Sequence, residues 1–320
     1  MKPSLLKPPL PLGPPADLDA AAAAIAVDNQ ADDQADNQAL AQLLAEPLAQ
    51  AWALPAVPAG ADALRSRLLG RAAASRQAER GFVTVRRRGL ARQALADGVV
   101  AQCLYTAPPG PGLRPGEPLR VRLIELASGA CISPDLLGPD PQDAEGRPLP
   151  CRREWLLLSG EVSLGEQALG VQTLSARDYH LTPAGQPLPT WVCHSTALLF
   201  LRESADSAPT AGPAERAFTL RDGDAGWPDF APGVQRRVLW QRGGQAALLY
   251  LAQAGAQVPQ HCHGHDEECL MLQGELYLDD LLLQAGDYQL APAGSGHRIT
   301  QTDAGAVIYA HGDVDFQFVA

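Results

Sequence analysis

The feature that most constrains the fold is an internal repeat. Four segments between residues 98 and 185 recur in the same order between residues 233 and 294. The clearest pairs are 154–161 (EWLLLSGE) with 268–275 (ECLMLQGE) and 177–185 (RDYHLTPAG) with 286–294 (GDYQLAPAG). Self-similarity in a fixed order indicates a duplicated structural unit. The length of 320 residues has room for about two domains, one for each copy.

Each copy consists of short apolar runs, such as 121–126 (VRLIEL) in the first and 247–251 (ALLYL) in the second. The runs are separated by turn-forming residues, in a chain with 30 Gly and 28 Pro. Many short strands punctuated by turns predict a β-sandwich or β-barrel. We therefore expect a mainly β protein with two tandem barrels.

The repeat also predicts the domain organisation. Residues 1–36 are rich in Pro, then in Ala, Asp, Gln and Asn, and can bury too little apolar area to offset chain entropy, so we expect disorder or a loosely held helix. Residues 37–78 carry helical apolar spacing, with one stripe formed by Ala61, Leu64, Leu68 and Leu69. The two copies are assigned to residues 79–204 and 217–320, joined by a linker at 205–216.

The composition excludes several classes of function. The net charge of -11 argues against binding to nucleic acid or to an anionic membrane, since both require a concentrated positive surface. No apolar run is long enough to span a bilayer, and prolines interrupt the first 15 residues, unlike a signal peptide. The six cysteines form no CxxC pair and are expected to be reduced thiols. Together these observations predict a cytoplasmic protein.

Four of the seven histidines lie between residues 261 and 297. His261 and His263 alternate, so on a strand both imidazoles project from the same face. Glu267 or Glu268 follows after a turn that contains Gly264, and His297 begins a later strand. Three imidazoles and one carboxylate converging in a barrel suit a borderline divalent metal ion.

The spacing His261-x-His263-x3-Glu267-x6-Gly274, followed by Gly286-Asp-Tyr-x3-Pro292-x4-His297, resembles the two characteristic motifs of the cupins. In detail it is similar to the cupin domain of ChrR-type anti-sigma factors, over roughly residues 217–320. The resemblance implies a double-stranded β-helix barrel that holds one divalent metal ion. The ligands it implies are His261, His263, Glu267 and His297. Zinc is the first choice of metal, and iron and manganese are the alternatives.

Several neighbours of this set are secondary candidates. Cys269 shares the face of Glu267 and could approach the metal, whereas His265 is expected on an exposed loop. Glu268 is expected on the opposite side of its strand. The polar residues considered for a supporting role are Glu268, Tyr277, Arg298 and Tyr309.

The first copy departs from the motif. At the four ligand positions it carries Arg147, Leu149, Arg153 and Leu188, and we therefore expect a cupin-shaped barrel without a metal. His180 and His194 with Cys151 or Cys193 could form a different site in this copy, but nothing in their spacing demands it.

The resemblance implies a regulator in which the metal cupin senses a small molecule or oxidant. The signal would pass through the helical N-terminus to a sigma factor or other regulatory protein. Residues 1–100 contain neither His nor Cys, so the zinc motif of the family's anti-sigma domain is not present. The alternative is a dioxygenase or isomerase acting on a small oxygenated substrate. A third hypothesis is a metal-stabilised storage or scaffold barrel, and a homodimer is a further arrangement to consider.

Overall fold

The computed structural model describes residues 61–79, 81–108, 116–143, 145–166, 170–206, 215–224, 226–315 and 317–318. The segment 1–36 and the part of the predicted helical segment from 37 to 60 lie outside these residues. The predicted stripe at 61–69 does lie in a helix, α2 (Ala61–Glu79). The chain divides into two units, residues 1–70 and 71–320. No helix in the described part of the chain has the length and apolar character needed to cross a membrane.

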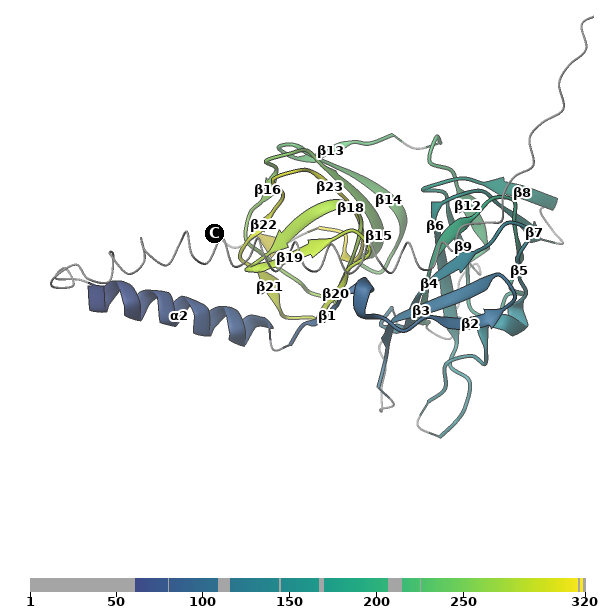
Figure 1. The fold of residues 1–320 in the computed structure, drawn as a ribbon, viewed down its shortest axis with the longest axis horizontal. Helices are drawn as coiled ribbons and strands as arrows, with labels where there is room; N and C mark the ends of the chain where they lie inside the picture. Colours follow the sequence, from purple (N-terminus) through teal and green to yellow (C-terminus); the bar gives the residue numbers. More distant parts are fainter. Residues whose placement is uncertain are drawn as a thin grey trace, which may run out of the picture. The chain divides into compact units, whose positions relative to one another are not determined.

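The first barrel consists of two antiparallel sheets (Figure 1). The strand orders are β12-β9-β6-β11-β4-β3-β2 and β5-β10-β7-β8. The strands are β2 (Gln93–Ala96), β3 (Val99–Thr106), β4 (Pro118–Leu126), β5 (Cys131–Ile132), β6 (Cys151–Ser159), β7 (Val162–Glu166), β8 (Gly170–Leu174), β9 (Tyr179–Thr182), β10 (Thr190–Cys193), β11 (Ala197–Ala205) and β12 (Phe218–Leu220), with 3-10 turns η1 (Arg87–Gly89) and η2 (Pro134–Leu137).

The second barrel repeats this plan, which confirms the mainly β fold with two tandem barrels. Its larger sheet follows β1-β20-β18-β23-β15-β14-β13, with β16, β19 and β22 attached, and its smaller sheet follows β21-β17-β24. The strands are β1 (Val83–Val85), β13 (Asp229–Ala231), β14 (Val234–Arg242), β15 (Gln245–Ala252), β16 (Gln257–Val258), β17 (His261–Cys262), β18 (Glu267–Leu278), β19 (Leu281–Gln284), β20 (Tyr288–Ala291), β21 (Gly296–His297), β22 (Thr300–Gln301), β23 (Ala306–Asp313) and β24 (Gln317–Phe318).

The two halves of the chain exchange a strand. β1 comes from the first half but pairs with β20 of the second barrel, and β12 comes from the second half but pairs with β9 of the first. The registers match, because Val85 lies opposite Tyr288 as Leu220 lies opposite Tyr179. Each exchanged strand is followed by an arginine that binds an aspartate of the other half, in the pairs Arg86–Asp287 and Arg221–Asp178. The exchange therefore joins the two barrels at two related places.

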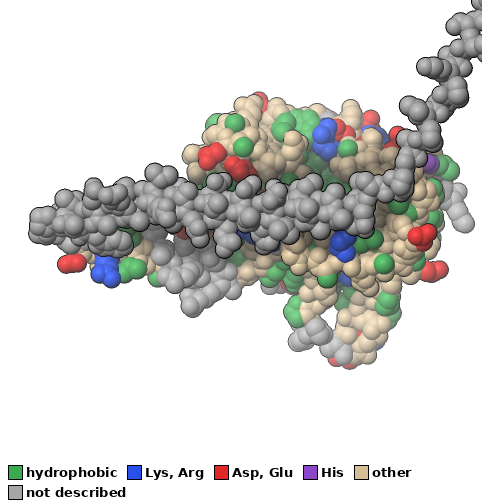
Figure 2. All heavy atoms as spheres, in the orientation of Figure 1, with side chains coloured by type: hydrophobic (Ala, Val, Ile, Leu, Met, Phe, Trp, Pro, Cys, Tyr) green, Lys and Arg blue, Asp and Glu red, His purple; other side chains and the backbone are tan. Residues whose placement is uncertain are grey.

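Apolar cores lie inside each barrel and between the two barrels. The interior of the first is filled by large side chains, including Trp155 and Trp191, whose rings lie 4.7 Å apart. The core between the barrels takes residues from both, such as Phe200 and Tyr309, at 4.8 Å between ring centres. On the face drawn in Figure 2, acidic and basic side chains are scattered among apolar and neutral ones.

Gly274, in a motif that both copies share, allows a close crossing of the chain. It has a φ of +76°, and an added Cβ would lie 2.0 Å from the carbonyl oxygen of Gly305. We expect Gly274→Ala to lower the free energy of unfolding by about 2–4 kcal/mol, from backbone strain and this clash. Urea unfolding would measure the loss. Gly255→Ala is the matched control, because its φ is +81° and nothing lies within 4 Å of the added Cβ. Equal losses in the two variants would show that the close crossing has no role.

Candidate metal centre

The small sheet of the second barrel aligns two of the four predicted ligands. His261 on β17 lies directly opposite His297 on β21 in the antiparallel register. Opposed residues of antiparallel strands bring their side chains close together. His263 follows two residues after His261, and Glu267 begins the long strand β18. Local strand pairing and alternation therefore place all four side chains in one part of the barrel.

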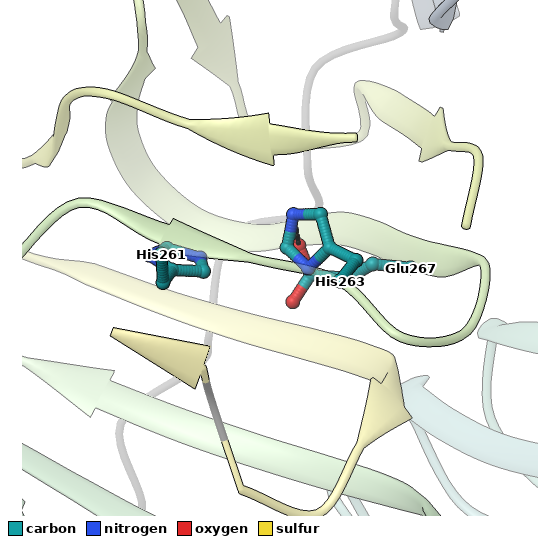
Figure 3. Close-up of side chains that lie close together, drawn as sticks. All are labelled: His261, His263 and Glu267. Carbon is teal, nitrogen blue, oxygen red and sulfur yellow. Dashed lines mark ion pairs between the residues drawn. The ribbon is translucent and has the colours of Figure 1, made fainter. Parts of the chain in front are cut away.

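The side chains meet at distances suited to a shared ion. One ligand atom each from His261, His263 and Glu267 lies within 4.8 Å of the other two, and Figure 3 shows these three side chains grouped together. The ring of His297 lies 5.7 Å from that of His261 and 5.1 Å from that of His263, measured between centres. Its Nε2 is 3.6 Å from Oε2 of Glu267. The structure thus brings together all four residues predicted from the sequence.

The donor set fits a divalent metal ion. The three histidines are each 2% exposed, and neither ring nitrogen of His263 has a hydrogen-bond partner. Nε2 of His263 has only the carboxylate of Glu267 nearby, 3.2 Å from its Oε2, and since buried polar atoms are normally satisfied, this ring is suited to a metal ion. The Nδ1 atom of His261 lies 3.0 Å from the carbonyl oxygen of Pro259, an arrangement that leaves its Nε2 to face the group. Three nitrogens and one carboxylate are a common ligand set for zinc, iron and manganese.

The electrostatics of the cluster also favour a cation. Burial acts to raise the pKa of Glu267, but the neighbouring histidines outweigh it and lower the pKa to about 2. Burial is the main cause that lowers the pKa of His263. For His297, burial is outweighed by hydrogen bonds with Asp279 and Glu267, which raise the pKa to about 9. Without a metal, His297 is therefore protonated, and its positive charge balances part of the negative charge of Glu267 and Asp279. A bound metal ion would supply positive charge in its place.

Asp279 supports this site and was not predicted from the sequence. Its Oδ2 lies 3.4 Å from Nδ1 of His297, and its Oδ1 accepts hydrogen bonds from the backbone N–H groups of Arg298 and Ile299. Asp279 has a φ of +56°, in the turn between β18 and β19. The Asp279-Asp280 pair between two apolar runs is a turn signal that could have placed it there.

Asp279→Asn is expected to weaken metal binding about 10- to 100-fold, because the carboxylate that orients His297 and raises its basicity is lost. Competition with a coloured chelator would measure the affinity. Asp280→Asn, at the next and more exposed position, should leave the affinity within about twofold of the wild type. If both variants bind as the wild type does, Asp279 does not position the ligand.

Phe82 is a second contact that the sequence did not reveal. It directly precedes the exchanged strand β1, and its ring packs edge-on against His297 at 5.2 Å between centres. The segment that leads from α2 into the barrel therefore touches one of the four predicted ligands.

A cavity of about 60 Å³ opens onto the ligand set inside the second barrel. His261, Glu267 and His297 contribute to its wall, together with Cys269, which was expected on this face. The remaining wall is mostly apolar, and as far as the structure describes that wall, no Lys or Arg lines it. The cavity is therefore suited to a small uncharged molecule next to the ligands.

The first barrel has a different interior at the corresponding positions. Arg153 occupies the place of Glu267 and forms ion pairs with Asp140 and Glu203. His180 packs against Trp191, and burial lowers its pKa to about 4. Within the residues that the structure describes, the only group of three or more candidate ligand side chains is the one in the second barrel.

The other secondary candidates have different surroundings. Glu268 faces away from the ligand set and binds Arg202 and Tyr288 in the core between the barrels. Tyr309 lies in the same core, with its hydroxyl 3.3 Å from Glu154. His265 is half-buried and pairs with Asp313. None of these three contacts joins the predicted ligands.

Comparison with known proteins agrees with this fold. Residues 215–315 match a family model described as the ChrR cupin-like domain. A proposed glyoxylate-induced protein from Pseudomonas aeruginosa is similar at a TM-score of 0.56 and 16% identity, over 73% of this chain and 90% of that one. Protein Ylba from E. coli has a TM-score of 0.55 and 16% identity, over 73% and 93%. A proposed dioxygenase from Nostoc punctiforme has a TM-score of 0.52 and 14% identity, over 75% and 85%. Among curated proteins, no sequence matches this chain.

Proposed function

We propose that the chain is a member of the cupin superfamily and that its second barrel binds one divalent metal ion through His261, His263, Glu267 and His297. Zinc is the first choice, because three imidazoles and a carboxylate complete a four-coordinate set. Iron and manganese suit the same donors. A bound ion would supply Lewis acidity at the end of the cavity.

We propose that this site works as a sensor whose state is passed to the N-terminal segment. The contact of Phe82 with His297 carries this proposal. Because Phe82 lies between α2 and the exchanged strand β1, a change in the position of His297 acts directly on the chain that leads to α2. A two-state change at a ligand is the kind of event that such a contact can transmit.

The chemistry of the cavity supports a small uncharged molecule or oxidant as the signal. About 60 Å³ has room for only a few atoms, and the described wall offers no Lys or Arg to a carboxylate. A charged metabolite would lose its hydration there, and the proposed metal ion alone would be available to offset a negative charge.

The receiver in this proposal is a sigma factor or other regulatory protein. Helix α2 exposes Leu64, Leu68 and Leu69, with 48%, 57% and 57% of their surface accessible. Leu64 and Leu68 are four residues apart and therefore share one helix face. Exposed leucines on one helix face are the kind of anchors that dock into an apolar groove of a partner.

Hydrogen exchange would test the sensor function on the full chain. We expect adding metal to the metal-free protein to change amide exchange in residues 61–79, and Phe82→Ala to abolish that change while metal is still bound. Phe318→Ala, on β24 next to β17, serves as the control. Identical exchange of residues 61–79 with and without metal in the wild type would exclude this function.

The alternative is a metal-dependent enzyme, a dioxygenase or isomerase acting on a small oxygenated substrate. The cavity that opens onto the ligand side chains favours it, because a substrate could reach the ion there. Oxygen-consumption and product assays with diols and dicarbonyls would distinguish the two. Turnover that disappears in His261→Ala would favour the enzyme over the sensor.

A further inference from the structure

A second cavity lies between the two barrels and is much larger than the one at the metal centre. It is a cleft of about 410 Å³, within the size range of sites for small molecules. Its wall includes Glu117 and Arg152 from the first barrel and Trp240, Arg242 and Asp266 from the second. Since both barrels contribute, the site would be incomplete with either one alone.

Arg152 brings unused hydrogen-bond donors to this cleft. Its side chain is 99% buried, and its guanidinium carbon lies 3.7 Å from the ring centre of Trp240. Its Nε is 3.4 Å from Glu154, but neither Nε nor Nη2 has a hydrogen-bond partner. Buried donors without partners are costly, so this side chain is suited to an acceptor that enters the cleft. A carboxylate, with its two oxygens, matches the fork of a guanidinium.

The other charges of the cleft restrict the ligand further. Arg242 also lines it, but its charge is offset by Asp206 and Glu215. Two carboxylates, those of Glu117 and Asp266, are part of the same wall. A ligand that complements both the positive and the negative side chains carries a hydrogen-bond acceptor for Arg152 and a positively charged donor for these carboxylates.

We propose that the cleft between the barrels binds a small amino carboxylate, with its carboxylate held by Arg152 and its ammonium group facing Glu117 and Asp266. The retained first barrel, which has lost the metal ligands, then has a clear role, because it supplies Arg152 and Glu117.

The position of the cleft also connects it to the metal centre. Gly264, His265 and Asp266 line the cleft, and these three residues are the whole connection between His263 and Glu267. A ligand in contact with this loop restrains both side chains. The second part of the inference is that a ligand bound in the cleft slows release of the metal. This part rests on the proposed metal site.

Calorimetry on the full chain tests binding with β-alanine as the probe, and with propionate and ethylamine as its two halves. We expect β-alanine to bind more tightly than either half. Arg152→Met should weaken β-alanine about 10-fold or more, because a charge-assisted pair is lost. Arg147→Met is the control, since Arg147 is exposed and its ion pairs in the described part of the chain are with Asp143 and Glu145 of its own loop. Unchanged β-alanine affinity in Arg152→Met, or no binding at millimolar β-alanine, would overturn the proposal.

A second variant tests the other end of the ligand without removing a buried charge. Glu117→Gln should weaken β-alanine and leave propionate unchanged, and equal effects on both would count against the proposed orientation. Metal release to a chelator, with and without β-alanine, tests the connection. Binding of β-alanine with an unchanged release rate would refute the connection alone, and failure to load metal would refute the metal site but leave the calorimetry valid.

Discussion

Replacing either His261 or His297 by alanine is expected to remove the metal ion from the protein. The wild type should carry about one metal per chain and each variant much less, because three remaining ligands bind a borderline ion far more weakly. The two histidines lie opposite each other on paired strands, so each variant removes one side of the site and leaves the strand pairing intact. Elemental analysis after gel filtration would measure the metal content.

His265→Ala is the matched control for this experiment. It lies in the loop between His263 and Glu267, but its imidazole is paired with Asp313. We expect this variant to keep its metal. Equal metal content in all four proteins would exclude the four-residue site, whereas loss in His265→Ala alone would identify His265 as the ligand.

The arrangement of the four ligand residues could be predicted from the sequence because it depends on local geometry. Alternation along a strand places His261 and His263 together, and a short turn returns the chain to Glu267. Asp279 and Phe82 could not be found in this way. Asp279 reaches His297 only because of an unusual backbone conformation in a turn, and Phe82 lies 215 positions away from it in the chain.

The two barrels were predictable for the same reason, since a duplicated pattern of short strands specifies a duplicated unit. The strand exchange was not. β1 and β12 contain three residues each, which is too short for an alternation pattern to assign them to a sheet. The segments 82–86 (FVTVR) and 217–221 (AFTLR) are a further, weaker repeat, and their relation becomes clear only from the matching registers.

The core between the barrels contains a buried ionic network that no motif indicated. Arg202 on β11 binds Glu154 of its own barrel at 3.0 Å and Glu268 of the second barrel at 2.7 Å. Tyr179 and Tyr288 donate to these two carboxylates, each at 2.8 Å. The two Glu–Tyr pairs occupy matching positions in the repeat. Glu154 lies on β6, which pairs with the strand of Tyr179 (β9), and Glu268 lies on β18, which pairs with the strand of Tyr288 (β20). One arginine thus forms ion pairs with related carboxylates from both barrels.

Arg202→Met is expected to lower the free energy of unfolding by about 3–5 kcal/mol, the cost of leaving a buried charge without its partner. Glu154 would keep Arg152 at 3.4 Å and the hydroxyl groups of Tyr179 and Tyr309. Of the polar contacts that the structure describes for Glu268, only the one with the hydroxyl of Tyr288 would remain. The loss should therefore arise mainly at Glu268, which is 1% exposed. Urea unfolding measures it, with the exposed Arg147→Met as a control expected to change stability by less than about 0.5 kcal/mol.

The pH dependence and a double variant identify Glu268 as the cause. Burial already raises the pKa of Glu268 above its usual value of 4.5, and loss of Arg202 raises it further. A carboxyl whose pKa is higher in the folded state destabilises that state above the unfolded pKa, so the deficit of Arg202→Met should shrink as the pH falls toward about 4.5. Arg202→Met with Glu268→Gln should recover most of the loss at neutral pH, since Tyr288 can still donate to the amide oxygen. A deficit that is independent of pH and remains in the double variant would instead trace the loss to packing around the Arg202 side chain.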